Sequence, residues 1–280
     1  MTWPYPLWVA HRGAGKLAPE NTLAGFRLGA SLGYRMFECD VKLSADDVPF
    51  LMHDATLGRT TNGVQLPGNS TNAPTVSVTS NVASKSVAKA VSRTSASPSI
   101  TAGDHPWHTL SQLDAGSWHS RAYAGEPLPT LANVAEFILR NGYFLNIEIK
   151  PTPGTERHTG EVVAREAARL WQDAAVPPLM TSFDPEALHG AVATAPHLPR
   201  GLLLDNLWSG WLETALQLGC VAIVCNHALW DKSTVTQAKS AGFRCLSYTV
   251  NDEWAAQRLI DLGTDGIITD RVDVFSPAAG

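Results

Sequence analysis

Short apolar runs recur eight times along this chain of 280 residues, and their spacing constrains the fold more than any other sequence feature. Most intervals between them carry helical periodicity, as in residues 23–32, 159–173 and 253–262. Alternating strands and helices predict a parallel sheet covered by helices, and eight strands suffice to close an α/β fold of the (β/α)8 barrel type. The predicted strands are Leu7–Ala10, Met36–Val41, Phe144–Ile149, Leu179–Ser182, Gly201–Leu204, Val221–Cys225, Arg244–Val250 and Gly266–Thr269. Functional residues are then expected at the C-terminal ends of the strands, where barrel active sites lie.

The length and composition favour one barrel domain over residues 1–280, with an insertion after the second barrel strand. Such barrels take about 250 residues, and 44% of this chain is hydrophobic, which is enough for one large core. The insertion is expected over approximately residues 55–135. Within it, residues 66–105 are dominated by Ser, Thr, Ala and Val. This low-complexity composition predicts a surface loop rather than a functional lid.

The second predicted strand places like charges on one face. Side chains two apart share a face of a strand, so Glu38, Asp40 and Lys42 point one way while Phe37 and Cys39 point the other. Neighbouring carboxylates repel each other unless a proton or a cation lies between them. A bound divalent metal ion is the simplest way to hold both carboxylates there.

The third predicted strand supplies a matching face with Asn146, Glu148 and Lys150. Three carboxylates from two strands form an all-oxygen site, which suits Mg²⁺ or Ca²⁺ rather than zinc. The alternative is an ion-pair network of these carboxylates with Lys42 and Lys150, without a metal. That alternative leaves the histidines and the arginine expected at the same end of the barrel unexplained.

Two histidines are expected beside this acidic face. Only Ser44–Val48 separates the second strand from residues 49–53, which is too short for a parallel crossover and predicts an antiparallel return. The return brings His53 roughly opposite Glu38, while His11 follows the first strand and precedes Arg12. Histidine, with an ordinary pKa near 6.5, serves as a general acid or base at neutral pH. A metal, cations and two histidines together indicate acid–base cleavage of a phosphate ester.

Several motifs, in order along nearly the whole chain, resemble those of the glycerophosphodiester phosphodiesterases. They are His11-Arg12-Gly13, Pro19-Glu20-Asn21-Thr22, Glu38-x-Asp40-Val41, His53-Asp54, Arg59-Thr60-Thr61-Asn62-Gly63, Asn146-x-Glu148-x-Lys150 and Thr249-Val250-Asn251. Any one of them alone is weak evidence, but the ordered set is specific. The resemblance implies a (β/α)8 barrel that hydrolyses glycerophosphodiesters to glycerol 3-phosphate and an alcohol with the help of a divalent cation.

The resemblance also implies roles for individual residues. The family's functional positions fall here on Glu38, Asp40 and Glu148 as metal ligands, His11 and His53 as general acid and base, and Arg12 and Lys150 as phosphate contacts. Either water or the adjacent 2-hydroxyl of the glycerol is a possible nucleophile, and either histidine a possible acid. Rival functions are a lysophospholipase D or phosphoinositide phospholipase activity on the same barrel, and non-catalytic binding of glycerophosphodiesters.

Some further residues have more than one possible role each. Asp54 is either an orienting partner of a histidine or a turn former, and Glu20 is placed to start a helix or to hold Arg12 or His11. Three further residues either line an alcohol-side pocket for a choline-like cation, pack in the core or anchor loops: Trp208, Trp211 and Trp230.

The overall charge and the hydropathy pattern exclude other classes of function. A net charge of −5 and a pI of about 6.0 argue against a nucleic-acid surface, and no apolar run approaches the roughly 20 residues of a membrane span. Met1–Val9 lacks the pattern of a secretion signal, so a cytoplasmic location and a small-molecule substrate are expected. The four cysteines lack the close paired spacing of a zinc site and are expected to be buried, reduced thiols. The sequence does not define the oligomeric state.

Overall fold

A closed parallel barrel forms the centre of the protein in the computed structural model, which describes residues 3–63 and 100–277. Its eight parallel strands follow one another around the barrel, and β1 pairs with both β9 and β2 to close it. The strands are β1 (Trp8–Ala10), β2 (Met36–Leu43), β4 (Phe144–Ile149), β5 (Leu179–Ser182), β6 (Arg200–Leu204), β7 (Ala222–Asn226), β8 (Arg244–Tyr248) and β9 (Gly266–Thr269). The predicted (β/α)8 fold is therefore confirmed.

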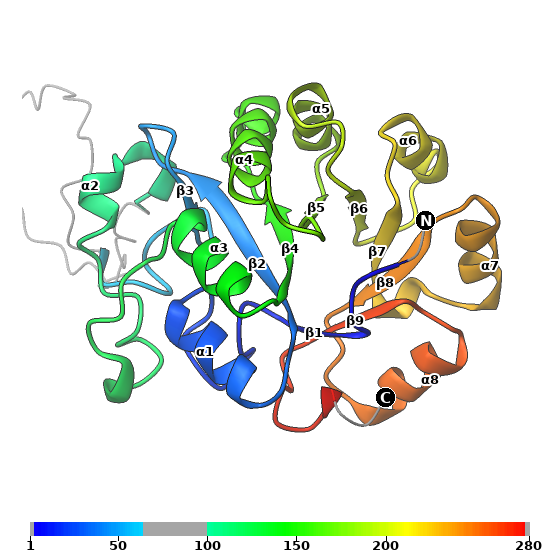
Figure 1. The fold of residues 1–280 in the computed structure, drawn as a ribbon, viewed down its shortest axis with the longest axis horizontal. Helices are drawn as coiled ribbons and strands as arrows, with labels where there is room; N and C mark the ends of the chain where they lie inside the picture. Colours follow the sequence, from blue (N-terminus) through cyan, green and yellow to red (C-terminus); the bar gives the residue numbers. More distant parts are fainter. Residues whose placement is uncertain (1–2, 64–99, 278–280) are drawn as a thin grey trace, which may run out of the picture.

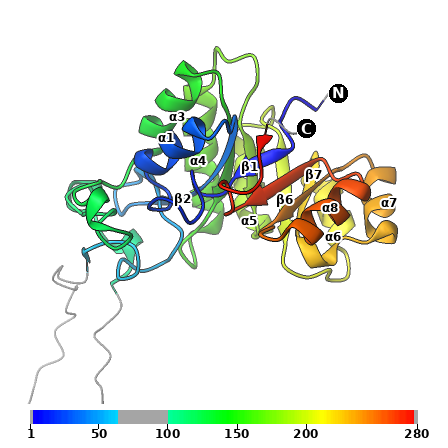
Figure 2. The ribbon, with the colours of Figure 1, turned by 90° about the horizontal axis from the view of Figure 1, so that it is seen from below.

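Helices surround the strands on the outside, as Figures 1 and 2 show from two directions. They are α1 (Leu23–Ser31), α3 (Leu131–Arg140), α4 (Glu156–Leu170), α5 (Pro185–Thr194), α6 (Trp211–Gln217), α7 (Lys232–Ser240) and α8 (Glu253–Asp261). Most begin at a side-chain cap; Thr22, Asp231 and Asp252, for example, each accept a hydrogen bond from a backbone N–H of the first turn. These caps fix where the chain turns from the barrel mouth into each helix.

The period-two alternation predicted for β2 and β4 places their side chains as expected. Phe37, Cys39 and Val41 pack outward in the layer between the strands and the helices. Residues of the opposite parity face the barrel interior, whose apolar lower part is filled by Val9, Met36, Leu179, Leu203, Ala222, Val224, Leu246 and Ile268. Glu38 and Asp40 continue the inward-facing row that Met36 begins. They therefore lie within the barrel, nearer the C-terminal end of β2 than Met36 does.

An antiparallel hairpin follows β2, as predicted from the short connection. Strand β3 (Pro49–Leu51) pairs with the end of β2, where Leu51 lies opposite Val41. The backbone N–H of Met52 then donates to the carbonyl of Asp40, at 3.0 Å. This pairing extends β2 to Leu43, beyond its predicted end, and carries His53 to the level of the acidic residues.

The insertion after β3 builds a small core of its own. Short helical elements η2 (Ala102–Asp104), α2 (Trp107–Leu110) and η3 (Arg121–Tyr123) belong to it, and its apolar residues cluster as Phe50, Met52, Leu57, Ala102, Leu110, Leu113, Ala115 and Leu128. Most of the low-complexity segment predicted over 66–105 lies outside the described residues. Its last part is described, and there Ala102 is fully buried in the insertion core.

The loop from β1 to α1 is tightly held against the barrel. Arg12 and Asn21 adopt left-handed backbone conformations, with φ of 52° and 56°, which are uncommon for residues other than glycine. The N–H of Asn21 donates to the carbonyl of Arg12 (2.9 Å) and thereby ties the two together. Helix α1 approaches this loop so closely that a Cβ on Gly29 would lie 2.2 Å from the carbonyl oxygen of Gly13. The loop that carries Arg12 is therefore fixed by packing as well as by hydrogen bonds.

Three of the four cysteines are buried, as expected, whereas Cys220 is only partly buried. All four are free thiols. Within residues 3–63 and 100–277, no helix combines the length and the apolar character needed to cross a membrane.

Candidate active site

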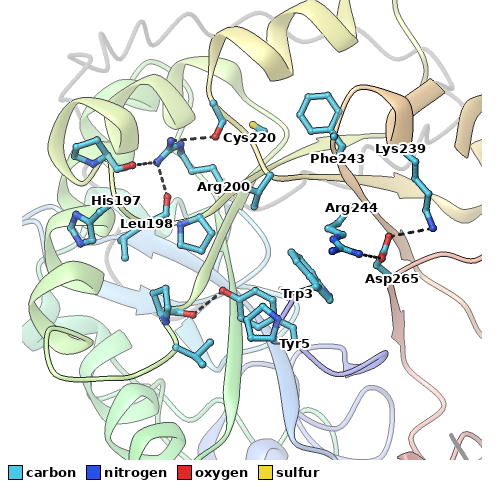
Figure 3. Close-up of a pocket in the computed structure, with 18 of the residues that line it drawn as sticks. Trp3, Tyr5, His197, Leu198, Arg200, Cys220, Lys239, Phe243, Arg244 and Asp265 are labelled. Carbon is cyan, nitrogen blue, oxygen red and sulfur yellow. Dashed lines mark hydrogen bonds and ion pairs between the residues drawn. The ribbon is translucent and has the colours of Figure 1, made fainter. Parts of the chain in front are cut away.

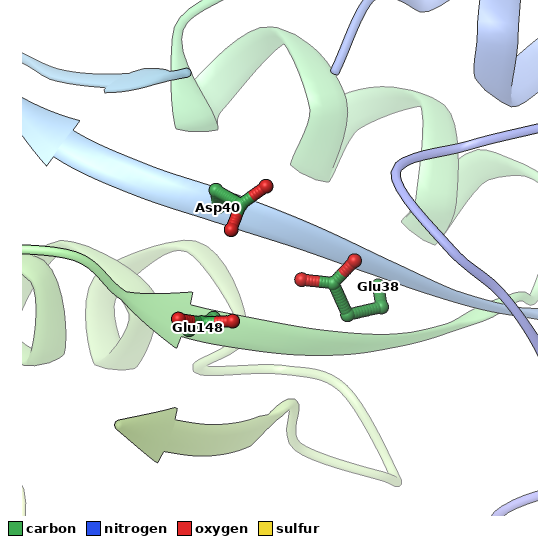
Figure 4. A group of neighbouring side chains, drawn as sticks. All are labelled: Glu38, Asp40 and Glu148. Atoms are coloured by element: carbon green, nitrogen blue, oxygen red, sulfur yellow. The ribbon is translucent and has the colours of Figure 1, made fainter. Parts of the chain in front are cut away.

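Three carboxylates converge inside the mouth of the barrel (Figure 4). Glu38 and Asp40 come from β2, and Glu148 comes from the neighbouring β4, where it pairs in register with Asp40. One carboxylate oxygen from each lies within 4.8 Å of the others. Glu38 and Asp40 are 2% and 1% exposed, so their charges are almost completely removed from water. The cluster is the arrangement predicted from the two strand patterns.

Without a cation, this cluster disfavours full ionisation. Burial and the neighbouring Asp40 raise the pKa of Glu38 well above its ordinary value, and the same causes raise the pKa of Glu148 to about 7. Burial acts on Asp40 as well, but Arg12 and Lys150 outweigh it and lower the pKa of Asp40. Oε1 of Glu38 and Oδ1 of Asp40 are buried and have no hydrogen-bond partner. Unpaired carboxylate oxygens in an all-oxygen cluster fit a hard divalent cation.

Arg12 and Asn21 hold the carboxylates of β2 in place. The backbone N–H of Arg12 donates to Oε2 of Glu38 (3.0 Å), and Nε of Arg12 lies 3.1 Å from Oδ2 of Asp40. Asn21 donates from Nδ2 to the same Asp40 oxygen (2.8 Å) and accepts from the Asp40 N–H (3.1 Å). The left-handed backbone of Arg12 and Asn21 makes these contacts possible. The unpaired oxygens of Glu38 and Asp40 are thus left as the available ligand atoms.

Two lysines lie on the other side of the cluster, but they differ in their contacts. Nζ of Lys150 lies 2.9 Å from Oε1 of Glu148 and 3.7 Å from Oδ1 of Asp40. The buried Lys42 instead donates to the backbone carbonyl of Lys150, at 3.3 Å. Burial and the charge of Lys150 lower the pKa of Lys42 to about 8. The ion-pair network considered in the sequence analysis therefore includes Lys150 but not Lys42.

His11 is held by an acidic residue that the sequence analysis did not single out. Its Nδ1 lies 2.6 Å from Oδ1 of Asp270, which directly follows β9. Asn251 donates from Nδ2 to the other oxygen of Asp270 and accepts from its backbone N–H, both at 2.9 Å. The opposite ring nitrogen of His11, Nε2, faces Oε2 of Glu38 at 3.8 Å. Asp270 thus orients His11 with one nitrogen turned toward the acidic cluster.

His53 is oriented in the same manner from the hairpin side. Its Nδ1 lies 2.8 Å from Oδ1 of Asp54, so Asp54 is an orienting partner rather than only a turn former. Arg59 donates to both oxygens of Asp54 and to both oxygens of Glu20, at 2.6–2.9 Å. Glu20 in turn accepts from Nη1 of Arg12 (3.0 Å). Burial lowers the pKa of His53 although Asp40 and Asp54 favour its charged form.

Six of the side chains described above line a small cavity of about 170 Å³ at the C-terminal ends of the strands: His11, Arg12, Glu38, His53, Glu148 and Lys150. Polar side chains form one wall. Phe183 and Tyr248 form part of the other, with their rings edge to face at 5.6 Å, and Nζ of Lys150 lies 5.6 Å from the centre of the Phe183 ring. The cavity therefore combines charged groups suited to a phosphate with aromatic rings suited to the carbon skeleton of an ester.

A larger cavity, of about 1000 Å³, lies at the opposite end of the barrel (Figure 3). Its lining comes from segments at the starts of β1 and of β5 to β9, and Asp265 is the one carboxylate among the described lining residues. Arg200 donates there to backbone carbonyls, including that of Leu198 (2.6 Å), and Arg244 pairs with Asp265 (2.9 Å). This cavity lacks the acidic cluster and the histidines of the barrel mouth, so the smaller cavity is the candidate active site.

All seven residues predicted for the site meet at the mouth of the barrel, in or beside the small cavity. The roles of Asp270 and Arg59 did not follow from the sequence patterns. Asp270 had a usable signal, because it directly follows the last predicted strand. Of the three tryptophans considered for a pocket, Trp211 and Trp230 are buried in the core, whereas Trp208 is substantially exposed. None of the three lines the small cavity.

The barrel and its acidic cluster define a (β/α)8 enzyme with a candidate metal site, and comparison with known proteins gives the family. The sequence model of the Glycerophosphoryl diester phosphodiesterase family matches residues 11–274. The glycerophosphodiester phosphodiesterase of Caldanaerobacter subterraneus subsp. tengcongensis is 29% identical over 94% of this chain and 93% of its own. The chain belongs to this family and is a phosphoric diester hydrolase.

Solved structures agree with this assignment. A phosphodiesterase from Oleispira antarctica, in complex with the product sn-glycerol-3-phosphate, superposes with a TM-score of 0.79 at 30% identity and covers 99% of this chain and 98% of its own. A glycerophosphodiester phosphodiesterase from Agrobacterium tumefaciens superposes with a TM-score of 0.69 at 26% identity, covering 97% and 99%. The similarity therefore extends over the whole barrel and is not confined to its motifs.

Proposed function

We propose that this protein hydrolyses glycerophosphodiesters to glycerol 3-phosphate and an alcohol, with a divalent cation and two-histidine acid–base catalysis. One observation carries the proposal: three neighbouring carboxylates, two of which have a buried oxygen without a hydrogen-bond partner, lie beside two histidines that are each oriented by an aspartate. The bound product in the Oleispira antarctica relative supports glycerol 3-phosphate as the product here.

Glu38, Asp40 and Glu148 would hold the cation, which is Mg²⁺ or Ca²⁺ because the ligand atoms are all oxygens. When bound, a divalent cation stabilises negative charge on a phosphate oxygen. Burial and the neighbouring Asp40 raise the pKa of Glu38 and Glu148 without a cation, and a positive charge held by these residues would favour their ionised forms.

Arg12 and Lys150 would bind the phosphate. Arg12 already contacts three carboxylates, and the donors of its guanidinium that remain are suited to an oxyanion. Lys150 acts as a point charge beside the same cavity. Both side chains are held by ion pairs before substrate arrives, so little reorganisation is needed on binding.

His11 and His53 would divide the proton transfers between them. One accepts the proton of the nucleophile, and the other donates a proton to the departing alkoxide. Water and the 2-hydroxyl of the glycerol are both compatible nucleophiles, and the latter gives a cyclic phosphate intermediate by proximity. Asp270 and Asp54 each fix the ring of one histidine, so that one nitrogen is directed for proton transfer.

The remaining parts of the proposal concern organisation and setting. The chain is proposed to act as one domain over residues 1–280, in the cytoplasm, on a small-molecule substrate and without a nucleic-acid partner. The low-complexity segment 66–105 is proposed to be dispensable for chemistry, because none of the seven predicted site residues lies within it.

Turnover of a substrate panel with and without metal tests the proposal. Exhaustive chelation should abolish hydrolysis of glycerophosphocholine, and Mg²⁺ or Ca²⁺ should restore it. The panel should include lysophosphatidylcholine and a phosphoinositide, since preferred turnover of either would favour a phospholipase function. Metal-dependent binding of glycerophosphocholine without turnover would favour a binding protein. Full activity of the metal-free protein would refute the metal site.

A further inference from the structure

Arg59 lies between the loop that carries Arg12 and the loop that carries His53. It follows the β2–β3 hairpin at the start of the insertion, and its side chain is 44% exposed. Its guanidinium donates through Nε and Nη2 to Asp54, at 2.6 and 2.9 Å, and through Nη1 and Nη2 to Glu20, at 2.8 and 2.7 Å. Asp54 contacts His53, and Glu20 contacts Arg12.

We propose that Arg59 is a positioning residue that fixes His53 and Arg12 relative to each other; this inference rests on the function proposed above. Asp54 and Glu20 belong to different loops, one after β3 and one after β1. With its two oxygens engaged by Arg59, each carboxylate is held in one orientation and presents a defined oxygen to its own partner. A displacement of Arg59 is therefore transmitted to both the acid–base group and the phosphate-binding group.

The contacts require an arginine rather than a positive charge alone. A guanidinium presents its donors as a planar fork and can engage two carboxylates at once, whereas an ammonium is a compact point charge. A lysine in place of Arg59 would be able to neutralise the local charge, but it would not hold both Asp54 and Glu20. Trp118 of the insertion contributes a further contact, with its ring centre 6.0 Å from the guanidinium carbon of Arg59.

A role limited to protein stability does not account for this arrangement. Arg59 is nearly half exposed, so water screens its ion pairs, and even a bidentate network contributes only modestly to folding stability at such a site. The residues that it connects are instead those at the site of chemistry. We therefore expect its replacement to change catalysis much more than thermal unfolding, because small misplacements of reacting groups lower rates strongly.

The variants Arg59→Lys and Arg59→Gln test the proposal, with Arg140→Gln as the matched control. Arg140 also pairs with a glutamate, Glu136, but it lies on helix α3 and is 77% exposed. Steady-state kinetics would give kcat and KM separately, and titration with glycerol 3-phosphate in the presence of Mg²⁺ would report phosphate binding. NMR signals of the His53 ring and the Arg12 side chain would report their positions without requiring activity.

Both Arg59 variants should lower kcat/KM by about 10- to 100-fold, with kcat reduced and glycerol 3-phosphate bound more weakly, while Arg140→Gln matches the wild type. Both NMR signals should shift in both Arg59 variants. Wild-type kinetics in Arg59→Lys would show that charge alone suffices, and unchanged signals in Arg59→Gln would exclude a positioning role; either result overturns the inference. Wild-type kcat in His53→Ala would refute the proposed mechanism instead, and the NMR comparison would still decide the role of Arg59.

Discussion

Replacing Asp270 by asparagine should impair catalysis by changing which nitrogen of His11 carries the proton. Asp270 accepts from Asn251 through one oxygen and lies 2.6 Å from Nδ1 of His11 through the other. In Asp270→Asn, Nδ2 of Asn251 can donate only to the oxygen of the new amide. The amide oxygen therefore faces Asn251, and the amide NH₂ faces His11. Nδ1 must then accept a hydrogen bond, and the proton moves to Nε2, the nitrogen that faces Glu38.

The size of the effect follows from the interaction that is lost. A hydrogen bond to a charged group contributes about 1.5–3 kcal/mol, and about 1.36 kcal/mol corresponds to a tenfold change in rate. If this energy stabilises the charged imidazolium of the transition state, kcat should fall about 10- to 150-fold. Complete loss of a general acid or base, roughly 10²- to 10⁴-fold, sets the upper limit.

The assay compares kcat for glycerophosphocholine in wild type, Asp270→Asn and the control Asp273→Asn, with thermal unfolding measured in parallel. Asp273 pairs with Arg271 on the surface and contacts neither histidine, so its variant should retain wild-type kcat. Proton and nitrogen NMR of the His11 ring should show the change of tautomer. A kcat within twofold of wild type in folded Asp270→Asn would refute the reasoning, and so would a lower kcat without a change of tautomer.

Three further predictions concern catalysis and stability. His53→Ala should lower kcat by roughly 10²- to 10⁴-fold with little change in thermal unfolding; near wild-type kcat would remove His53 from the mechanism. Although burial opposes it, the hydrogen bond with His11 lowers the folded pKa of Asp270 to about 2, below the unfolded value near 3.9. The stabilisation that ionised Asp270 gives the folded protein should therefore be complete above about pH 4 and lost as pH falls toward 2. In urea unfolding, the free energy of unfolding of Asp270→Asn should depend less on acid pH than that of the wild type. Gly29→Ala should lower the free energy of unfolding by about 1–3 kcal/mol, because its Cβ would lie 2.2 Å from the Gly13 carbonyl oxygen; an unchanged denaturation midpoint would show that α1 shifts freely.

Patterns within single strands and short links predicted the positions of the acidic residues and of His53. The period of two in β2 assigned Glu38 and Asp40 to the interior, and the short link to β3 predicted the antiparallel return that carries His53. The register of β2 and β4 then places Glu148 beside Asp40, as their separate patterns suggested.

The contacts between distant segments could not be predicted in this way. Asp270 meets His11 across 259 positions of sequence, and only closure of the barrel between β1 and β9 brings them together. Arg59 meets Glu20 across 39 positions, between two loops whose relative placement the sequence does not define. The sequence pattern also cannot separate exposed from buried tryptophans such as Trp208 and Trp230, because their burial depends on how the surrounding helices pack.

Under the proposed mechanism, the pairing of His11 with Asp270 makes turnover a measure of complete folding. These residues follow the first and the last strands of the barrel, so a chain that has formed β2 to β8 but has not joined β9 to β1 still lacks the oriented histidine. Contacts between such distant segments form slowly because a long chain must first be brought together. During refolding from denaturant, enzymatic activity should therefore recover no earlier than the slowest structural phase. Partly folded molecules would escape detection in the assay even when most of their helices had formed.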